Sequence, residues 1–219
     1  MNRTLSILTS VALLSLPVVA ILAVFAWLYN GIVNKEERVY QAWSQVESNL
    51  QRRADLIPGL VETVSRYMRH ERETLDDVTD QRAGALEPLD EAARRLMADQ
   101  ERVAGAGGAT PEDERALAQL ADTQRTLAGS IRRFMAVAES YPSLKAGDQF
   151  LSLQAQLEGT ENRINVARME FNRAVGSFNG AIRRLPGTLV ASLGGFRRKG
   201  YFEAQGDAGE PAELEFAGN

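Results

Sequence analysis

The residues best suited to metal or acid–base chemistry lie around the single histidine of the chain, His70. It stands beside Glu71 and Glu73 in the sequence RHERE, and an imidazole with carboxylates makes at most a weak site for a divalent cation. A zinc site of the HExxH type needs a second histidine four residues further on, and position 74 is threonine. Because the chain has no cysteine, a thiolate nucleophile is excluded. We therefore predict no catalytic residue, no metal site and no cofactor.

Other catalytic and nucleotide-binding patterns are missing from the sequence as well. The glycine-rich sequence GAGG at 105–108 is not followed by the GK[ST] of a P-loop, so we interpret it as a helix connector. The sequence GSFNG lacks the central serine of a nucleophile elbow. Asp76 and Asp77 are neighbours on a predicted helix and point about 100° apart, so they do not converge as an acid and a base would. The sequence predicts a protein that is not an enzyme.

An arginine interrupts an apolar line of the first predicted helix. Arg53 falls on the same heptad line as Val46 and Leu60. One interpretation is bundle specificity, in which Arg53 pairs with an acid such as Glu158 or Glu161. The other makes Arg53 part of a polar groove for a partner helix or peptide.

Three asparagines, Asn165, Asn172 and Asn179, repeat every seven residues beside the large apolar line of a later helix. The same two interpretations apply to them. The asparagines either bridge neighbouring helices within the bundle or present a polar surface to a partner.

Five cations gather around the end of the last long predicted helix. They are Arg183, Arg184, Arg197, Arg198 and Lys199. If that helix runs antiparallel to the first, this end lies near the membrane, and Arg197, Arg198 and Lys199 are candidate contacts for anionic lipid headgroups. The alternative is a solvated helix end whose cations complement the helix dipole.

Helices must position these residues, and the first predicted helix begins with an apolar run. The run Leu5–Leu28 is about 36 Å long as a helix, enough to cross a hydrocarbon core of about 30 Å. A cleaved signal peptide is the alternative, but its apolar core is shorter and is followed by a small-residue cleavage site. We predict a retained single-pass anchor with Trp27 and Tyr29 at its end and Pro17 in its middle.

The remaining sequence predicts amphipathic helices. The first stripe of apolar residues keeps its phase across Pro58. We therefore expect one helix from Leu5 to about Arg82 that is kinked at Pro58. Three further helices are expected. One covers about 88–103, the next starts at a cap on Thr110 and ends at Tyr141, and the last covers about 150–184. A short apolar turn then folds back to cap the bundle. Residues 205–219 are small and acidic, which predicts weak order.

The fold class is therefore all-α: a long antiparallel bundle of three to four helices, up and down, after one transmembrane helix. We expect a tail at 1–4, the transmembrane helix at 5–28, a bundle domain at 29–200 and a partly disordered tail at 201–219. With a net charge of only −4, no global basic field recruits nucleic acid. The numbers of lysines and arginines on the two sides of the anchor are nearly equal, so they do not decide its orientation. A long domain after the anchor crosses the membrane largely regardless of its charge, which favours a bundle outside the cytoplasm.

Several ordered motifs resemble the LemA family of bacterial membrane-anchored proteins. They are YNGIV at 29–33, AWSQVESNLQRRADLIPGLVETV at 42–64, YMRHERETL at 67–75, YPSLKA at 141–146, FLSLQAQLEGTENRINVARMEFNRAV at 150–175 and GFRRKGYFEA at 195–204. The resemblance implies an anchor in the cytoplasmic (inner) membrane and a helical bundle outside the cytoplasm. It implies no established enzymatic activity and links some relatives to membrane-embedded metalloproteases. Residues 86–110 depart from it as an additional helical arm.

The function that these features favour is a membrane-anchored, non-enzymatic scaffold or adaptor that presents a bundle surface to other membrane or envelope proteins. The alternative is a protein that assembles with copies of itself and organises or shapes the membrane.

Overall fold

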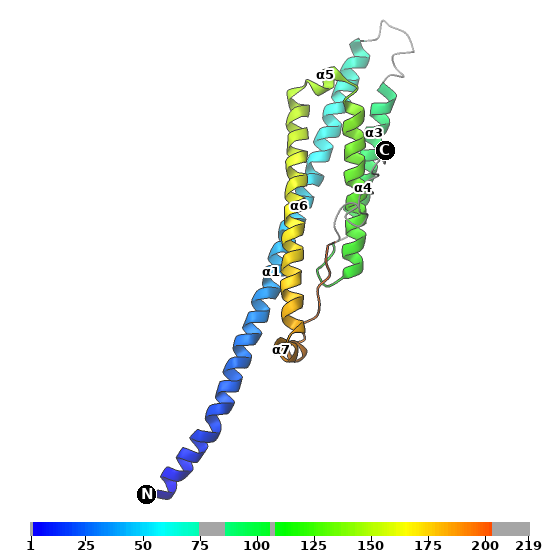
Figure 1. Cartoon of the computed structure of the whole chain (residues 1–219). Helices are drawn as coiled ribbons and strands as arrows, with labels where there is room; N and C mark the ends of the chain where they lie inside the picture. The colour runs from blue at the N-terminus through cyan, green and yellow to red at the C-terminus, as the bar shows by residue number, and fades with distance from the viewer. Residues whose placement is uncertain (1, 75–85, 106–107, 203–219) are drawn as a thin grey trace, which may run out of the picture.

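The computed structural model describes residues 2–74, 86–105 and 108–202, with side chains from residue 16 onward except at residue 74. All regular structure in these residues is helical, and four long helices run up and down the molecule (Figure 1). This confirms the predicted all-α antiparallel bundle. The helices are α1 (Asn2–Thr74), α3 (Glu87–Gly105), α4 (Glu114–Ala138), α5 (Pro142–Lys145), α6 (Asp148–Arg183) and α7 (Gly187–Gly194).

Helix α1 is the longest element, with 73 residues. It continues through both Pro17 and Pro58, as the unbroken phase of its apolar stripe predicts. Its first part extends alone beyond the bundle (Figure 1), and large apolar side chains there are exposed, among them Leu16 at 75% and Ile21 at 68%. The predicted continuation of this helix beyond Thr74, including Asp76 and Asp77, lies outside the described residues.

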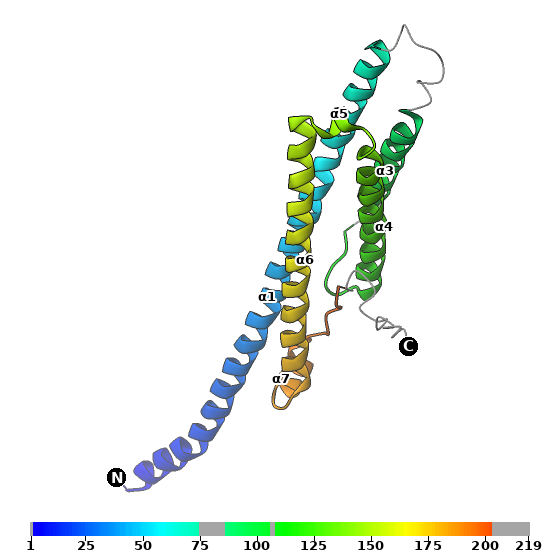
Figure 2. The ribbon, with the colours of Figure 1, turned by 45° about the horizontal axis from the view of Figure 1, so that its top comes forward.

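Helix α6 packs antiparallel along α1, and the two form the spine of the bundle (Figures 1 and 2). The large residues of its heptad line, Phe150, Leu157, Ile164, Phe171 and Phe178, are all buried. Smaller residues on the neighbouring line, such as Thr160 and Ala167, are buried too. This alternation of large and small side chains lets the two helices approach closely.

Helices α3 and α4 form a second antiparallel pair that lies against the spine (Figure 2). Leu89, Ala93 and Leu96 of α3 are buried in the same core as Leu127 and Phe134 of α4. The segment 86–105 is therefore a packed member of the bundle, where the sequence suggested an additional arm. Its helix is where the periodicity predicts it.

The start of α4 differs from the sequence-based prediction. The cap is Asp113, whose carboxylate accepts hydrogen bonds from the backbone N–H groups of Arg115 and Ala116, both at 3.0 Å. Thr110 instead closes a preceding turn, its carbonyl accepting from the N–H of Asp113 at 3.1 Å. Pro111 lies within that turn, which delays the helix by one turn and gives the capping role to the aspartate.

After α6 the chain reverses twice. Gly187 begins α7 so close to α6 that a Cβ atom there would lie 2.2 Å from the carbonyl oxygen of Ala181. Gly195 ends α7 with φ at +72°, a conformation that only glycine adopts easily. The following segment, residues 195–202, runs back along α6 without regular structure, and we call it the strap (Figure 1). The predicted turn is thus a short helix plus a strap.

The core of the bundle consists of two apolar clusters. The one nearer the start of α1 contains Trp43, Phe171, Phe178 and Phe202, whereas the farther one contains Ile57, Phe134 and Leu157. Between the two clusters lie several buried polar side chains, among them Arg53, Gln124 and Thr160. Of the predicted C-terminal tail at 201–219, Phe202 is buried in the bundle, and residues 203–219 lie outside the described residues.

Candidate functional site

The polar layer between the two apolar clusters is centred on Arg53 of α1. Its guanidinium is 1% exposed, and Nη1 donates to the Glu161 carboxylate of α6 at 2.8 Å. Nη2 donates to the side-chain carbonyl of Gln124 on α4, so one side chain joins three helices. The third nitrogen, Nε, has no hydrogen-bond partner within the described part of the chain. Glu161 is one of the two acids that the bundle-specificity interpretation names.

A second arginine extends this layer. Arg168 of α6 is 6% exposed, and its guanidinium carbon lies 4.5 Å above the centre of the Phe202 ring. Burial lowers the pKa of both Arg53 and Arg168, and the nearby Glu161 carboxylate opposes that shift in each case. Both groups stay charged at neutral pH because an arginine pKa lies far above it. The Glu161 carboxylate therefore stabilises the charged form of both buried arginines.

Two asparagines of α6 bind the strap through its backbone. Asn179 donates from Nδ2 to the Lys199 carbonyl at 2.9 Å and accepts from the Lys199 N–H at 3.0 Å. Asn172 repeats the same pair of bonds with Phe202, at 2.8 and 2.9 Å. We call these two reciprocal pairs the asparagine ladder. Asn165, the third member of the sequence series, is exposed and makes no such bond to the described residues.

The spacing of the ladder follows from helix and strand geometry. Seven residues of helix rise about 10.5 Å, and three residues of an extended chain cover about 10 Å. Asparagines seven residues apart on α6 therefore meet strap residues three apart, 199 and 202. The sequence left open whether the asparagines bridge helices or face a partner, whereas in the structure Asn172 and Asn179 hold an extended segment of the same chain.

Lys199 fastens the strap to two further elements. Its ammonium lies 2.5 Å from the Glu112 carboxylate, 2.7 Å from Glu36 of α1 and 2.9 Å from the Tyr40 hydroxyl. It also faces the rings of Tyr40 and Phe178, at 4.9 and 5.6 Å from their centres. We call Glu36, Tyr40, Glu112 and Lys199 the Lys199 cluster.

The electrostatics of this cluster favour its charged form. Burial lowers the pKa of Lys199, but the hydrogen bonds to Glu112, Glu36 and Tyr40 outweigh it, and the pKa is raised above 10.5. Burial likewise raises the pKa of Glu112, and its bonds to Lys199 and Tyr40 outweigh that effect and lower the pKa below 4.5.

The predicted headgroup contact is wrong for Lys199. With 5% of its surface exposed and two carboxylates bound, its ammonium cannot reach a lipid. Arg197 and Arg198, by contrast, are exposed at the end of the molecule next to α7. The sequence shows five cations in one cluster, and only tertiary contacts with Glu36 and Glu112 separate the buried one from the others.

Beyond the strap, an open groove of about 370 Å³ lies between α4 and α6. We call it the α4–α6 groove. Its apolar wall includes Ile131, Met135 and Leu157, and the buried Arg53 lies at its inner side. The residues that line it are Arg53, Ala128, Ile131, Arg132, Met135, Ala136, Glu139, Gln154, Leu157, Glu158 and Glu161.

The rim of the α4–α6 groove is mainly acidic. Glu139 and Glu158 are exposed and Glu161 is half-buried, whereas Arg132 is the exposed cation among its lining residues. An apolar wall with an acidic rim suits an amphipathic segment that carries positive charge. Sequence analysis singled out Glu158 and Glu161 only as partners for Arg53, because the two walls of the groove come from distant parts of the chain.

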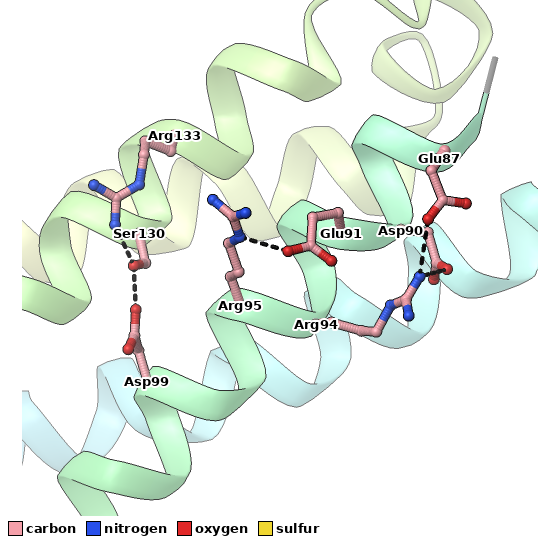
Figure 3. Close-up of polar contacts among 8 residues, drawn as sticks. All are labelled: Glu87, Asp90, Glu91, Arg94, Arg95, Asp99, Ser130 and Arg133. Carbon is pink, nitrogen blue, oxygen red and sulfur yellow. Dashed lines mark hydrogen bonds and ion pairs between the residues drawn. The ribbon is translucent and has the colours of Figure 1, made fainter. Parts of the chain in front are cut away.

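The polar contacts on α3 have a simpler role. Arg94 and Arg95 pair with Asp90 and Glu91 one turn earlier on the same helix (Figure 3). Asp99 accepts a hydrogen bond from Ser130 and so joins α3 to α4. Exposed pairs of the first kind contribute only about 0.3–0.5 kcal/mol each to helix stability. They make no binding site.

His70 lies on the exposed surface of α1. In the described residues, no three His, Asp or Glu side chains converge in a way that could hold a metal ion. The same part of the chain contains one helix that is long and apolar enough to cross a membrane, the N-terminal α1.

Comparison with known proteins agrees with this architecture. The chain is similar to the magnetosome protein MamQ of Magnetospirillum gryphiswaldense, at 27% identity over 201 residues that cover 90% of this chain and 71% of the relative. It is also similar to the magnetosome protein MamQ 2 of Paramagnetospirillum magneticum, at 28% identity over 193 residues, 86% of this chain and 69% of the relative. These relatives and the apolar helix make the protein membrane-associated.

The family model of LemA proteins matches residues 42–216, which include most of α1 within the bundle and all of α3 to α7. The match therefore covers the polar layer, the asparagine ladder and the α4–α6 groove, and it includes Glu112 and Lys199 of the Lys199 cluster. The chain belongs to the LemA family.

Proposed function

We propose that this protein is a membrane-anchored scaffold that binds a cationic, amphipathic segment of another membrane or envelope protein in the α4–α6 groove. The observation that carries the proposal is the groove itself: apolar walls, an acidic rim and a buried arginine with one unsatisfied donor. The proposal includes no chemical step.

We further propose that α1 crosses the cytoplasmic membrane once and holds the bundle on its extracytoplasmic side. Support comes from the exposed apolar side chains of the first part of α1, such as Val19 at 63% and Leu22 at 62%, since these side chains are otherwise left in water. The length of that part suits a bilayer core.

Photocrosslinking in cells tests the groove. A photoreactive amino acid is placed at Ala136, an exposed groove residue, and at Leu151 as a control that is exposed on α6 but does not line the groove. Asn172 is a poor probe position, because its amide holds the strap. We expect an adduct with another membrane protein from position 136 that is missing from position 151.

Charge reversal sharpens this test. The double variant Glu139→Lys and Glu158→Lys changes two exposed side chains of the groove rim, so thermal stability should stay the same while the adduct falls at least fivefold. Adducts with a second copy of the chain only would favour lateral self-assembly instead. A groove probe that reacts only within its own chain would overturn the scaffold proposal.

A further inference from the structure

The short helix α7 exposes a row of leucines at the end of the bundle. Leu185 just before it, and Leu189 and Leu193 within it, are 78%, 63% and 78% exposed. Leu189 and Leu193 are four residues apart and share one face of α7, whereas Leu185 lies in the turn that precedes the helix. Val190 and Ala191 lie on the opposite side and are buried against the bundle. α7 is thus amphipathic, with its apolar exposed face directed away from the core.

This face lies at the level where the apolar run of α1 ends. A groove of about 460 Å³ is lined by Trp27 and Leu28 of α1 together with Leu185 and Pro186. The ring of Phe196, just after α7, is 5.3 Å from the ring of Tyr29. Trp27 is itself 74% exposed. Leu185 and the exposed Trp27 therefore line one groove where α1 leaves the predicted span, and α7 lies across the end of α6 (Figure 1).

The charges around α7 are of one sign. No aspartate or glutamate occurs between Glu170 and Glu203, a stretch that contains five arginines and Lys199. Arg183 and Arg184 before α7 and Arg197 and Arg198 after it are all exposed. Elsewhere the chain is acidic enough to give a net charge of −4. An apolar helix face flanked by exposed arginines is the pattern of helices that lie in the interface of an anionic membrane.

We propose that α7 is a second membrane contact: it lies in the interfacial region of the bilayer, with Leu185, Leu189 and Leu193 among the lipid chains and the four arginines at anionic headgroups. The inference rests on α1 crossing the membrane. Because α7 is packed on both α1 and α6, this contact holds the bundle at one angle and height above the bilayer. A single helix without it would let the bundle tilt freely.

The absence of cysteine makes this directly measurable on the full chain. Single cysteines carrying a nitroxide spin label are introduced at Ser192, an exposed position beside the leucine face, at Val19 in the apolar run and at Leu151 at the far end of the bundle. The protein is reconstituted in vesicles of phosphatidylcholine with one-third phosphatidylglycerol. Collision with oxygen, which concentrates in lipid, is compared with collision with a water-soluble nickel chelate.

We expect the label at 192 to resemble the label at 19, with high oxygen and low nickel accessibility, and the label at 151 to be fully accessible to nickel. If position 192 behaves like 151 while position 19 is in lipid, the contact by α7 is wrong and the anchor stands. If positions 19 and 192 are both in water, the anchor itself fails. Protection of position 192 from both reagents indicates a protein contact and also overturns the inference.

A second variant separates membrane contact from folding. In the background of Leu189→Ser and Leu193→Ser, the label at 192 should become at least threefold more accessible to nickel. The unfolding temperature in detergent should not change, because both side chains are exposed. Equal nickel accessibility with and without the two leucines would overturn the role given to them.

Discussion

Arg53 shows how one buried charge can organise a helical bundle. It is the largest fully buried side chain in the described structure, and it takes hydrogen-bond partners from two other helices. A slip of α1 by one heptad would place an apolar residue against Glu161 and Gln124 and bury the arginine without partners. A buried ion pair adds little net stability compared with apolar packing, but breaking one is costly. The polar layer therefore mainly fixes the register of α1 against α4 and α6.

Replacing Arg53 by Met tests this at the residue scale. Gln124, at 6% exposure, loses its buried partner, so we expect the free energy of unfolding to fall by about 2–4 kcal/mol. The double variant Arg53→Met and Gln124→Leu should recover most of the loss, since no buried polar group of the pair then remains. Chemical denaturation of the four proteins in the cycle measures the coupling. Strict additivity of the two single effects would contradict the assigned role.

The Lys199 cluster makes the strap sensitive to pH at both extremes. The folded pKa of Glu112 is below 4.5. The stability that its carboxylate gives to strap binding is therefore complete above that value and is lost as the pH falls through the folded pKa. The folded pKa of Lys199 is above 10.5, so its contribution is complete below that value and is lost as the pH rises through the folded pKa. Strap binding should thus be constant between about pH 5 and 10.

Trp43 reports this release, because its ring lies 6.1 Å from that of Phe202 on the strap. In the variant Trp27→Phe it is the single tryptophan left. We expect its emission to shift to the red below about pH 4.5, and Glu112→Gln to weaken the strap already at neutral pH. An acid transition of unchanged midpoint and amplitude in Glu112→Gln would show that another group controls it.

At the scale of elements, the strap is the feature that a bundle of helices alone would not need. It has no regular structure of its own, and its backbone groups are satisfied by asparagine side chains of α6 and by the Pro111 carbonyl, which accepts from Gly200 at 2.8 Å. Gly200 has no room for a side chain, since a Cβ there would lie 2.9 Å from Leu117. The strap thereby joins α6 to the start of α4.

The three asparagines of α6 offer a matched test of this element. Asn179→Ala and Asn172→Ala each leave a strap N–H and carbonyl without partners, which should cost about 1–3 kcal/mol in unfolding free energy. Asn165→Ala, on the same heptad line but exposed, should change it by less than about 0.5 kcal/mol. Denaturation followed by circular dichroism compares them. Equal costs at all three positions would contradict the ladder.

At the scale of the whole molecule, one continuous helix serves both the predicted membrane span and the bundle. α1 passes from its exposed apolar part into the core without a break, so the bundle has a defined direction relative to the anchor. The proposed contact by α7 would add a second fixed point. The α4–α6 groove lies beyond the strap, on the part of α6 farther from the anchor. A partner would be bound at a defined distance from the bilayer.

The side of the membrane on which the bundle lies can be measured with single cysteines. Leu151→Cys is 45% exposed at the far end of the bundle, and Thr4→Cys precedes the apolar run. In spheroplasts, a membrane-impermeant maleimide should label position 151 directly and position 4 only after lysis. The reverse pattern would place the bundle in the cytoplasm.

The sequence by itself determined the helices, their order and the apolar face of each, because these depend on local periodicity, proline and glycine. The heptads of α6 and the unbroken phase of α1 across Pro58 are examples. The sequence also identified Arg53 and the asparagines as unusual, because they are polar residues on or beside the apolar heptad lines of their helices. The all-α fold and the LemA family follow from this level of information.

Only the tertiary structure decided what those polar residues do. Arg53 meets Gln124 across 71 positions of sequence, and Lys199 meets Glu36 from a segment far away in the sequence. Asn172 and Asn179 hold an extended segment whose path no periodicity encodes. Periodicity reports which face of a helix is buried but not which distant chain segment buries it. The groove, the strap and the exposed leucines of α7 all arise from that second kind of contact.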